Sequence, residues 1–448
     1  MKILIVGASV AGLEAAFYAR KRYPSATIQL LDQSQVLGYH PTRFNRYLIG
    51  EFETLEGEDH ALQEKLANQN ITCLLNCRAL KILPADKSLQ IFYQGRVQSL
   101  TYDAMILATG SQDNQRLVQD FEEDSSLIKI RSLEESRQSL ELLKQSDQVL
   151  VVGAGQIGLE ASQVYHRVGK QVTLLEASEY LNFKYLDHPM SERIQRRLEQ
   201  AGIRIVTGAT VNRMSFHPPF CQIETSKAAY QTKAVQLATN FVPNSAWLKD
   251  QVTCYPDGTV QVDDYLQTSV PQVFAIGDLI RVPFGPYREK IYLPLVHHAK
   301  NSAKIAVENL FYQQLKRPIS QRIIVSYLFD QTLLCGGLTE EEMRLTGRRI
   351  FVSYQEDGED FIQILSDFYT GQVLGVQALS RRDISRSAAY LEEILACQKT
   401  DQALALESAF YRNGESVEQE RDWLDFESHY LKRLAARNEA CDASQSAF

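Results

Sequence analysis

The sequence lacks three features that would each point to a class of protein. No apolar run approaches the ~18 consecutive residues that a membrane-spanning helix needs. Positive charge is not in excess, because 47 Lys and Arg against 55 Asp and Glu give a net charge of −8 at pH 7. That balance disfavours nucleic acid and anionic membrane surfaces as partners. The segment Met1–Val6 has neither the charged lead nor the long apolar core of a signal peptide, so we expect a cytoplasmic protein.

Cysteine is also sparse, with seven residues scattered along 448 positions. An odd, scattered set in a chain of this length argues against a disulfide framework. Cys73 and Cys77 lie four positions apart, which is not the spacing of a C-x-x-C redox or zinc pair. We therefore expect no metal site, and we interpret the thiols as structural or incidental.

What the sequence does contain is material for several hydrophobic cores, since 44% of its residues are hydrophobic. At roughly 150 residues per domain, the length suggests about three domains. An apolar run, a glycine turn, a helical pattern and a second apolar run follow one another between residues 2 and 32. The same order restarts at residue 148, and two copies of one unit argue for two nucleotide-binding sites.

The first glycine turn has the sequence Gly7-Ala-Ser9-Val-Ala-Gly12. In a dinucleotide-binding fingerprint the first glycine permits the tight turn, and the last lets the helix pack on the strand. The middle position lets the backbone approach a pyrophosphate at the helix N-terminus, and Ser9 is small but imperfect there. Asp32 ends the second strand, where a carboxylate can bind a ribose.

The second glycine turn, Gly153-Ala-Gly155-Gln-Ile-Gly158, has all three glycines. Glu176 ends the strand that follows it. An acid at this position hydrogen-bonds the ribose hydroxyls of NAD and repels the extra phosphate of NADP. We therefore predict NADH rather than NADPH, and a hydride transfer between two bound dinucleotides.

These motifs resemble those of the flavin-dependent pyridine nucleotide–disulfide oxidoreductases, over Met1 to about Asn413. The motifs that carry this resemblance are GASVAG with Asp32, ILATGS at 106–111, VVGAGQIGLEAS with Glu176, and VFAIGD at 273–278. The resemblance implies that the chain binds FAD. It assigns the ribityl chain of FAD to Gly277-Asp278 and places Thr109-Gly110 beside the cofactor.

Within that family the chain is most similar to the branch of NADH oxidases, NADH peroxidases and coenzyme A disulfide reductases. The segments KYLDHPMSERIQRRLEQAGI, IYLPLVHHAKNSAKIAVENL and LFDQTLLCGGLTEEE carry this similarity. It implies that the C-terminal part is a dimerisation domain. It also implies that Leu295–His298 begins a helix aimed at the flavin ring, where a helix N-terminus would stabilise negative charge.

The chain departs from the pattern of this branch at the reactive positions. Thr42 stands where the redox cysteine is expected, Val10 replaces a histidine, and Gln156 replaces a tyrosine. The segment that approaches the flavin from the partner subunit is also altered, at 408–412. The polar residues that remain as candidates near the flavin are His40, Arg43, Arg46, His297 and His298. Glu160 is a candidate for positioning the nicotinamide, although it can equally pack on its helix face.

We therefore expect an α/β fold with two Rossmann-like nucleotide-binding domains and a C-terminal α+β dimerisation domain. The FAD-binding domain is expected in two segments, 1–112 and 245–318. The NAD-binding domain is expected at 113–244 and the interface domain at 319–448. Residues 295–315 are expected to form one long helix, and 33–59 a turn-rich loop.

Three functions remain open at this point. The first is an NADH oxidase-like enzyme that passes electrons from the flavin to oxygen or a small acceptor. The second is a reductase of a redox protein partner, and the third is a non-catalytic NADH- and FAD-binding sensor. Threonine cannot form a sulfenate, so turnover should run through the flavin alone and yield hydrogen peroxide from oxygen. Cys335 is the nearest alternative thiol, but its surroundings predict an interface strand.

Overall fold

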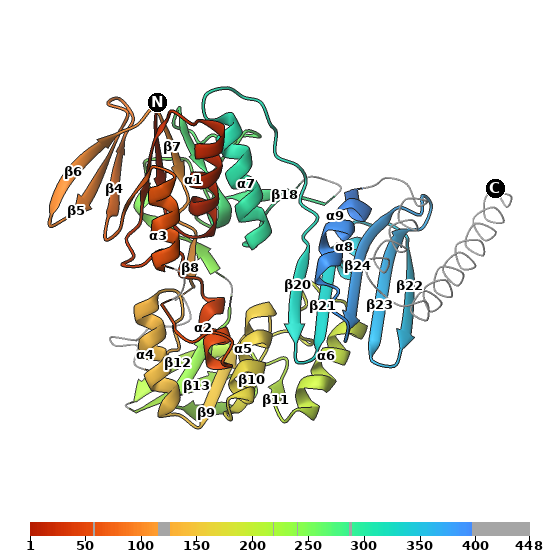
Figure 1. The fold of residues 1–448 in the computed structure, drawn as a ribbon. Helices are drawn as coiled ribbons and strands as arrows, with labels where there is room; N and C mark the ends of the chain where they lie inside the picture. Colours follow the sequence, from red (N-terminus) through yellow and green to blue (C-terminus); the bar gives the residue numbers. More distant parts are fainter. Residues whose placement is uncertain (57–58, 115–125, 218, 240, 286–288, 397–448) are drawn as a thin grey trace. The chain divides into compact units, whose positions relative to one another are not determined.

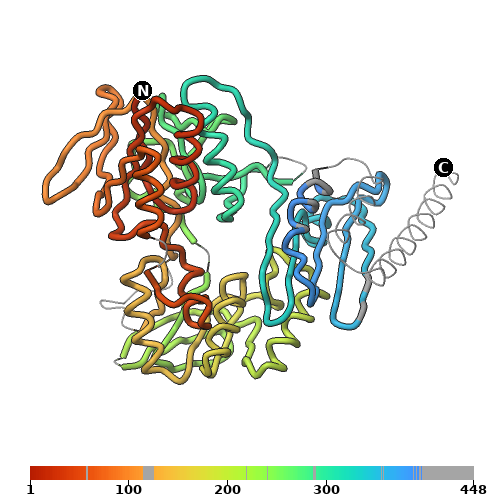
Figure 2. The backbone as a smooth tube through the Cα atoms, in the orientation of Figure 1, coloured from red at the N-terminus to blue at the C-terminus, as the bar shows by residue number. Residues whose placement is uncertain are grey.

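The computed structural model describes residues 1–56, 59–114, 126–217, 219–239, 241–285 and 289–396 (Figure 1). Two compact units account for these residues. The first consists of Met1–Gly153, Val164–Leu174 and Ala209–Ser320. The second consists of Ala154–Gln163, Leu175–Gly208 and the chain from Gln321 onward. The path of the chain within each unit can be followed in Figure 2.

A five-stranded parallel sheet forms the core of the first unit. Its strand order is β17-β7-β1-β2-β3. Strand β17 enters the sheet from far along the chain, with Val273 paired to Met105 of β7. These strands are β1 (Lys2–Val6), β2 (Thr27–Leu31), β3 (Ile71–Leu74), β7 (Ala104–Leu107) and β17 (Val273–Ala275).

Helices α1 and α7 lie side by side in this unit (Figure 1). The α-helices of this unit include α1 (Val10–Arg22), α2 (Thr42–Leu48), α3 (Asp59–Asn68), α4 (Leu133–Lys144) and α7 (Val296–Asn309). The single-turn helices are η2 (Ala246–Leu248) and η3 (Gly277–Leu279). Smaller sheets and hairpins add β4 (Arg78–Leu83), β5 (Ser88–Tyr93), β6 (Arg96–Thr101), β8 (Ser111–Asp113), β16 (Phe241–Pro243), β18 (Arg281–Phe284) and β19 (Glu289–Tyr292).

Two expectations about these helices were wrong. Helix α7 ends at Asn309 rather than continuing to Leu315, because the buried Asn309 side chain accepts hydrogen bonds from the N–H groups of Gln314 and Leu315. These bonds turn the chain out of the helix. The turn-rich segment 33–59 contains helix α2, which the polar composition concealed.

A second Rossmann-like sheet follows the second glycine turn, with strand order β11-β10-β9-β15. The restart of the strand–turn–helix–strand pattern is therefore confirmed, and with it the α/β class. Its strands are β9 (Gln148–Val152), β10 (Gln171–Leu175), β11 (Arg204–Val206) and β15 (Ala234–Leu237). Its helices are α5 (Gln156–Arg167) and α6 (His188–Gln200), and an adjoining sheet has β12 (Val211–His217), β13 (Phe220–Thr225) and β14 (Ala229–Thr232).

The C-terminal part forms a five-stranded antiparallel sheet in the order β20-β21-β24-β23-β22. Leu391 and Leu395 of α9 pack with Leu334, Ile364 and Val376 of the sheet in one apolar cluster. The elements are β20 (Ile324–Leu328), β21 (Gln331–Gly337), α8 (Glu340–Leu345), β22 (Ile350–Asp357), β23 (Asp360–Asp367), β24 (Val373–Ser380), η4 (Ser385–Ser387) and α9 (Ala388–Ala396). The altered segment 408–412 lies outside the described residues.

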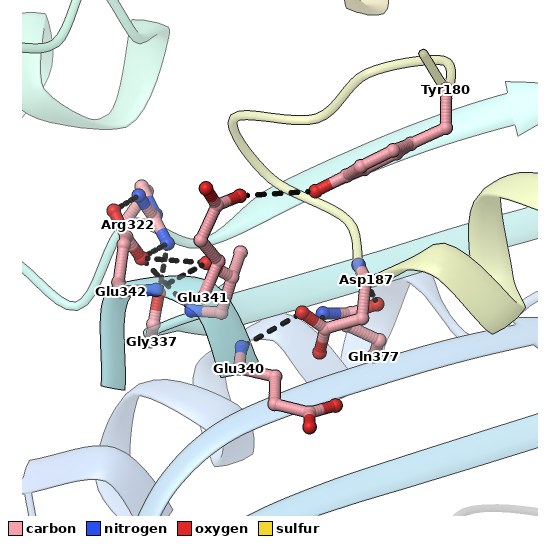
Figure 3. Close-up of polar contacts among 9 residues, drawn as sticks. Tyr180, Asp187, Arg322, Gly337, Glu340, Glu341, Glu342 and Gln377 are labelled. Carbon is pink, nitrogen blue, oxygen red and sulfur yellow. Dashed lines mark hydrogen bonds and ion pairs between the residues drawn. The ribbon is translucent and has the colours of Figure 1, made fainter. Parts of the chain in front are cut away.

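Asp187 links the start of α6 to this sheet (Figure 3). Its Oδ2 accepts hydrogen bonds from the amides of Gln363 and Gln377, each at 2.8 Å, and its Oδ1 accepts one from the N–H of Glu340 at 2.8 Å. Burial raises the pKa of the Asp187 carboxyl to about 6. A buried carboxylate held by three donors ties α6 to β23, β24 and α8.

Arg322 makes a second polar link in the same unit (Figure 3). Its guanidinium donates to both carboxylate oxygens of Glu342, at 2.7 and 2.6 Å, and to the carbonyl of Gly337 at 2.6 Å. The bidentate pair joins the segment before β20 to helix α8.

Candidate functional site

The first glycine turn brings three backbone segments into contact at the carboxyl end of the first sheet. Gly7 has a φ of +109°, and a Cβ there would lie 2.2 Å from the carbonyl oxygen of Ala108. A Cβ on Gly12 would lie 1.8 Å from the carbonyl oxygen of Gly7. Both positions therefore require glycine. Ser9 precedes α1, is exposed and makes no side-chain bond to cap the helix, which leaves its hydroxyl available to a ligand.

Asp32 holds this turn through its carboxylate. Its Oδ2 accepts a hydrogen bond from the N–H of Ala8 at 2.5 Å, and its Oδ1 accepts one from the N–H of Ser34 at 2.8 Å. A carboxylate has about four lone-pair positions, so two donors leave capacity for ribose hydroxyls. The predicted ribose-binding acid thus lies against the predicted pyrophosphate turn.

The second glycine turn repeats this arrangement. Glu176 accepts hydrogen bonds from the N–H of Ala154 at 2.7 Å and from the N–H of Ser178 at 2.8 Å. Gly153 has a φ of +99°, and a Cβ on Gly155 would have no neighbouring atom within 4 Å. The backbone beside Gly155 therefore has open space into which a pyrophosphate can come close.

Asp278 lies in η3, directly after strand β17. Its Oδ2 accepts a hydrogen bond from the hydroxyl of Ser111 at 2.9 Å. Burial raises the pKa of the Asp278 carboxyl, while the Ser111 bond and the positive charge of Arg131 oppose that rise. Thr109-Gly110 lies just before Ser111, and the Thr109 hydroxyl donates to the carbonyl of Asn244 at 2.8 Å. Residues predicted from two distant motifs therefore meet at one place.

Arg131 and Tyr292 belong to the same cluster, and sequence reasoning missed both. The Arg131 Nε donates to Asp113 at 2.9 Å, and its guanidinium carbon lies 3.8 Å from the ring centroid of Phe241. Arg131 Nη2 is a buried nitrogen that has no hydrogen-bond partner within the described residues, and the buried hydroxyl of Tyr292 lies next to Ser111. Burial and the nearby Asp278 charge raise the pKa of Tyr292. No local signal marks these two residues, because Arg131 is placed by its contacts with β8 and β16, and Tyr292 ends the β18–β19 hairpin far along the chain.

The unpartnered Nη2 of Arg131 provides a test of whether the site fits FAD. Buried polar groups in folded proteins are nearly always hydrogen-bonded, so orphaned donors indicate a missing polar ligand. Arg131 and Tyr292 lie within electrostatic reach of Asp278, the residue predicted to hold the ribityl chain. A cofactor with phosphates and several hydroxyl groups would satisfy such donors. The cluster therefore fits FAD.

The loop between β2 and α2, together with helix α2 itself, holds three of the predicted candidates. His40 Nδ1 lies 2.7 Å from the hydroxyl of Thr42. The Arg43 guanidinium donates to the carbonyl of Thr54 at 3.1 and 3.2 Å, and that of Arg46 pairs with Glu51 at 2.7 Å. The two guanidinium carbons lie 4.2 and 4.4 Å from the ring centroid of Phe52. Both arginines are thus engaged in local contacts, whereas His40 lies in the electrostatic field of Arg131.

Helix α7 begins after Leu295, with His297 and His298 in its first turn. His298 Nε2 lies 2.8 Å from the hydroxyl of Ser320, and burial lowers the pKa of His298 to about 4. His297 Nε2 lies 2.8 Å from the side-chain amide of Asn301. His298 is therefore neutral near pH 7.

Glu160 lies one turn into α5, in the second unit. It borders a pocket lined by Gln156, Leu159, Glu160, Asn182, Ser326, Tyr327, Leu328 and Leu333. Gln156, at the position where a tyrosine was expected, donates to the carbonyl of Val325 at 3.5 Å. The structure therefore brings the predicted Glu160 close to Gln156, and both next to the second glycine turn.

The described cysteines are all free thiols with unfavourable surroundings for a thiolate. Burial raises the pKa of Cys73 and Cys335 to about 12 and that of Cys77 and Cys221 to about 11. Cys335 is buried in β21, which confirms the predicted strand, while its place in an interface stays a prediction. Cys397 and Cys441 lie outside the described residues.

Within the part of the chain that the structure describes, no three His, Cys, Asp or Glu side chains gather as metal ligands would. None of its helices has both the length and the apolar character needed to cross a membrane.

Comparison with known proteins gives matches over most of the chain. The profile of the family described as pyridine nucleotide-disulphide oxidoreductase matches residues 1–303. An NADH oxidase of Enterococcus faecalis (strain ATCC 700802 / V583) is 25% identical over 426 residues, covering 92% of this chain and 95% of that protein. A rubredoxin-NAD(+) reductase of Pseudomonas putida is 26% identical over 314 residues, covering 69% of this chain and 80% of that protein.

Among solved structures, the fold matches that of a water-forming NADH oxidase from Lactobacillus brevis bound to NADH. The TM-score is 0.81 at 24% identity, with 90% of this chain and 92% of that chain covered. The likeness extends the agreement in fold beyond the segment that the family profile matches.

Proposed function

The chain belongs to the pyridine nucleotide-disulphide oxidoreductase family, and from this premise we propose that it is an FAD-dependent enzyme that oxidises NADH. It passes the electrons to oxygen or to another small acceptor. The observation that carries the proposal is the repeated arrangement in which Asp32 holds one glycine turn and Glu176 holds the other. A chain with two dinucleotide sites has the parts needed to transfer a hydride from one ligand to the other.

FAD would occupy the site in the first unit. The residues that would hold it are Gly7, Ser9, Gly12, Asp32, Thr109, Gly110, Arg131, Gly277, Asp278, Tyr292, Leu295 and His298. When bound, FAD supplies a ring that accepts a hydride at N5. Asp32 would bind a ribose, and the backbone of the turn would accommodate the pyrophosphate. Asp278 and Ser111 would fix the ribityl chain.

NADH would occupy the second turn, at Gly153, Gly155 and Gly158, with its ribose at Glu176. The Glu176 carboxylate keeps lone pairs for the ribose hydroxyls after accepting two backbone bonds, and its negative charge repels a 2′-phosphate. Glu160 would orient the nicotinamide. Hydride transfer then depends on positioning, with the reacting atoms about 3–3.5 Å apart.

The acceptor would be reached without a thiol, because Thr42 stands where the redox cysteine is expected and the described cysteines favour the neutral form. Arg43, Arg46 and His297 are the polar residues predicted to act near the flavin. Electron transfer from the flavin alone to oxygen most simply gives hydrogen peroxide.

A reductase of a redox protein is the second candidate function, and it is supported by the match to the rubredoxin-NAD(+) reductase. That match covers 69% of the chain, whereas the NADH oxidase match covers 92%. A match of 92% must include most of the C-terminal sheet. The coverage therefore favours a small acceptor. A non-catalytic NADH-binding sensor is the third candidate. The kinetics of flavin reduction by NADH distinguish it from the two enzymes.

We propose the domain division 1–112 and 245–318 for FAD, 113–244 for NAD, and 319–448 for an interface domain. The antiparallel sheet of the last segment has no nucleotide turn, so its most economical role is to pair two copies of the chain, and two-fold dimers are the commonest oligomers. Sedimentation at micromolar concentration should therefore give a homodimer. A monomer at that concentration would contradict this assignment.

Anaerobic addition of NADH to the purified holoprotein tests the enzymatic function. The visible absorbance of the flavin should decrease when NADH is mixed in and return when air is admitted. Rapid recovery in air indicates an oxidase. Bleaching with recovery only after a redox protein is added indicates the reductase, and no bleaching indicates the sensor.

A further inference from the structure

The chain that follows strand β10 holds the second glycine turn by both polar groups of one peptide unit. Glu176 accepts a hydrogen bond from the N–H of Ala154, and the N–H of Asn182 donates to the carbonyl of Ala154 at 2.9 Å. Asn182 has a φ of +51°, a left-handed conformation that asparagine tolerates better than most residues. The position of Ala154 in the turn therefore depends on where Asn182 lies.

The residues from Asn182 to Asp187, named the 182–187 segment, form one closed turn before helix α6. The N–H groups of Tyr185 and Leu186 donate to the carbonyl of Asn182 at 2.9 and 3.1 Å. These bonds span the segment, so its two ends cannot move independently while the bonds persist. A displacement of Asp187 is therefore passed to Asn182.

Asp187 is bound to the C-terminal sheet rather than to its own helix. It is the N-cap residue of α6, where an aspartate commonly accepts a hydrogen bond from the first turn, but its side chain makes no such bond. Its carboxylate instead accepts from Gln363, Gln377 and Glu340 (Figure 3). The N–H of Asp187 also donates to Oε1 of Gln377 at 2.9 Å. Asp187 and Gln377 thus form a reciprocal pair of hydrogen bonds.

The 182–187 segment also borders the pocket beside Glu160. Asn182 lines this pocket together with Gln156, Glu160 and residues of β20 and β21. The pocket, the turn at Ala154 and the glutamines of the sheet all belong to the second compact unit. An unbroken series of hydrogen bonds therefore joins the C-terminal sheet to the predicted NADH site.

We propose that Asp187 is a positioning residue through which the C-terminal sheet controls the affinity of the second glycine turn for NADH. This inference rests on the proposed function, and it adds control of that site by a sheet that has no nucleotide motif. A pyrophosphate binds such a turn through closely approaching backbone N–H groups, so a small displacement of Ala154 weakens binding. Asp187 itself contacts no ligand, so its removal should change NADH binding rather than the rate of hydride transfer.

The test measures NADH binding separately from the reduction that follows it. Holoprotein is mixed anaerobically with increasing NADH in a stopped-flow instrument, which gives a Kd for NADH and a limiting rate of flavin reduction. Gln377→Leu removes both bonds of the reciprocal pair from inside β24 and should raise the Kd roughly 3- to 30-fold. The limiting rate should stay within twofold of wild type.

Matched variants separate positioning from a general loss of stability. Arg197→Ala removes another link between α6 and the C-terminal sheet, the ion pair with Asp330 at 2.6 Å, and should leave the Kd unchanged. Gln363→Met removes one donor to Asp187 and should raise the Kd less than Gln377→Leu, which provides a test if Gln377→Leu does not fold. Asp187→Asn keeps an acceptor oxygen for the glutamines and should recover part of the affinity that Asp187→Ala loses.

Hydrogen–deuterium exchange gives a readout that does not depend on NADH. In ligand-free holoprotein, the amides of the 182–187 segment should exchange slowly in wild type and in Arg197→Ala, and faster in Gln377→Leu or Gln363→Met. Equal exchange in all of these proteins would overturn the proposal, as would a Kd within twofold of wild type for both glutamine variants. An equal rise of the Kd in Arg197→Ala would also overturn it. A wild type that binds no NADH would instead overturn the proposed function and leave the exchange measurement valid.

Discussion

Glu176 accepts at 2.7 Å a hydrogen bond from the backbone N–H of Ala154, within the second glycine turn. The acid that is expected to select the nucleotide also holds the loop that is expected to bind its pyrophosphate. A change at Glu176 should therefore act on nucleotide choice and on affinity together.

Glu176→Gln should reduce the preference for NADH over NADPH by roughly 10- to 100-fold, since it removes a charged acceptor near the ribose. The amide retains one oxygen to accept from Ala154, so the turn should persist. Stopped-flow reduction of the flavin by each nucleotide measures the ratio. Equal efficiency of the wild type with NADPH would show that Glu176 does not reach the ribose.

Asp278→Ala should weaken retention of FAD, because Ser111 loses its acceptor and the ribityl chain loses its predicted partner. Asp278→Asn keeps an acceptor oxygen and should retain more cofactor. The ratio of flavin to protein absorbance after gel filtration reports the effect. The bound flavin should be FAD rather than FMN, and unchanged FAD content in Asp278→Ala would remove this residue from the site.

Asp187 predicts a pH dependence of stability. Its pKa is raised to about 6 in the folded protein from an ordinary value of 3.8, so the folded state binds the proton more tightly than the unfolded state. The stabilisation is complete below pH 3.8 and is lost as the pH rises through 6. At 1.36 kcal/mol per pKa unit, the loss is about 2–3 kcal/mol.

The comparison that isolates this effect is wild type against Asp187→Asn, unfolded with urea at several values between pH 4 and pH 8. The free energy of unfolding of the wild type should fall relative to the variant as the pH rises. A difference that stays constant across this range would show that Asp187 titrates normally.

The absence of a thiol centre predicts the electron count. Anaerobic titration with NADH should end at two electrons per subunit, whereas a flavin with a redox cysteine would take four. Alkylation should leave activity intact, because burial raises the pKa of Cys335 to about 12 and that of Cys73 equally far. A four-electron endpoint would require a search for another sulfur.

Sequence patterns were sufficient to predict those parts of the site that are formed by residues close together along the chain. The glycines of both turns and the acids Asp32 and Glu176 lie at fixed offsets within one strand–turn–helix unit, so their spacing predicts their contact. Helix α4 also had a local signal that went unused. Ser132 and Glu135 form a capping box at its start.

The remaining residues of the candidate site come from distant segments of the chain that only the fold brings together. Ser111 and Asp278 meet because β17 joins the sheet beside β7. Arg131 joins them through its contacts with β8 and β16, and Tyr292 through the β18–β19 hairpin. Nothing local distinguishes Arg131 from the other arginines of the chain. The length of α7 was overestimated for a similar reason, since the apolar pattern continues past Asn309 while its side chain ends the helix.

The late entry of β17 into the first sheet has a consequence for synthesis on the ribosome. Strand β7 cannot pair with Val273–Ala275 until the whole second Rossmann-like sheet has been made. At about 5–20 residues per second, the nascent protein spends on the order of ten seconds or more with one edge of its first sheet open. Asp278 lies just beyond β17, so cofactor capture at this cluster should wait until this part of the chain has been made. An open strand edge is prone to pairing with other chains. Newly made protein should therefore depend on chaperones more than its mature fold would suggest.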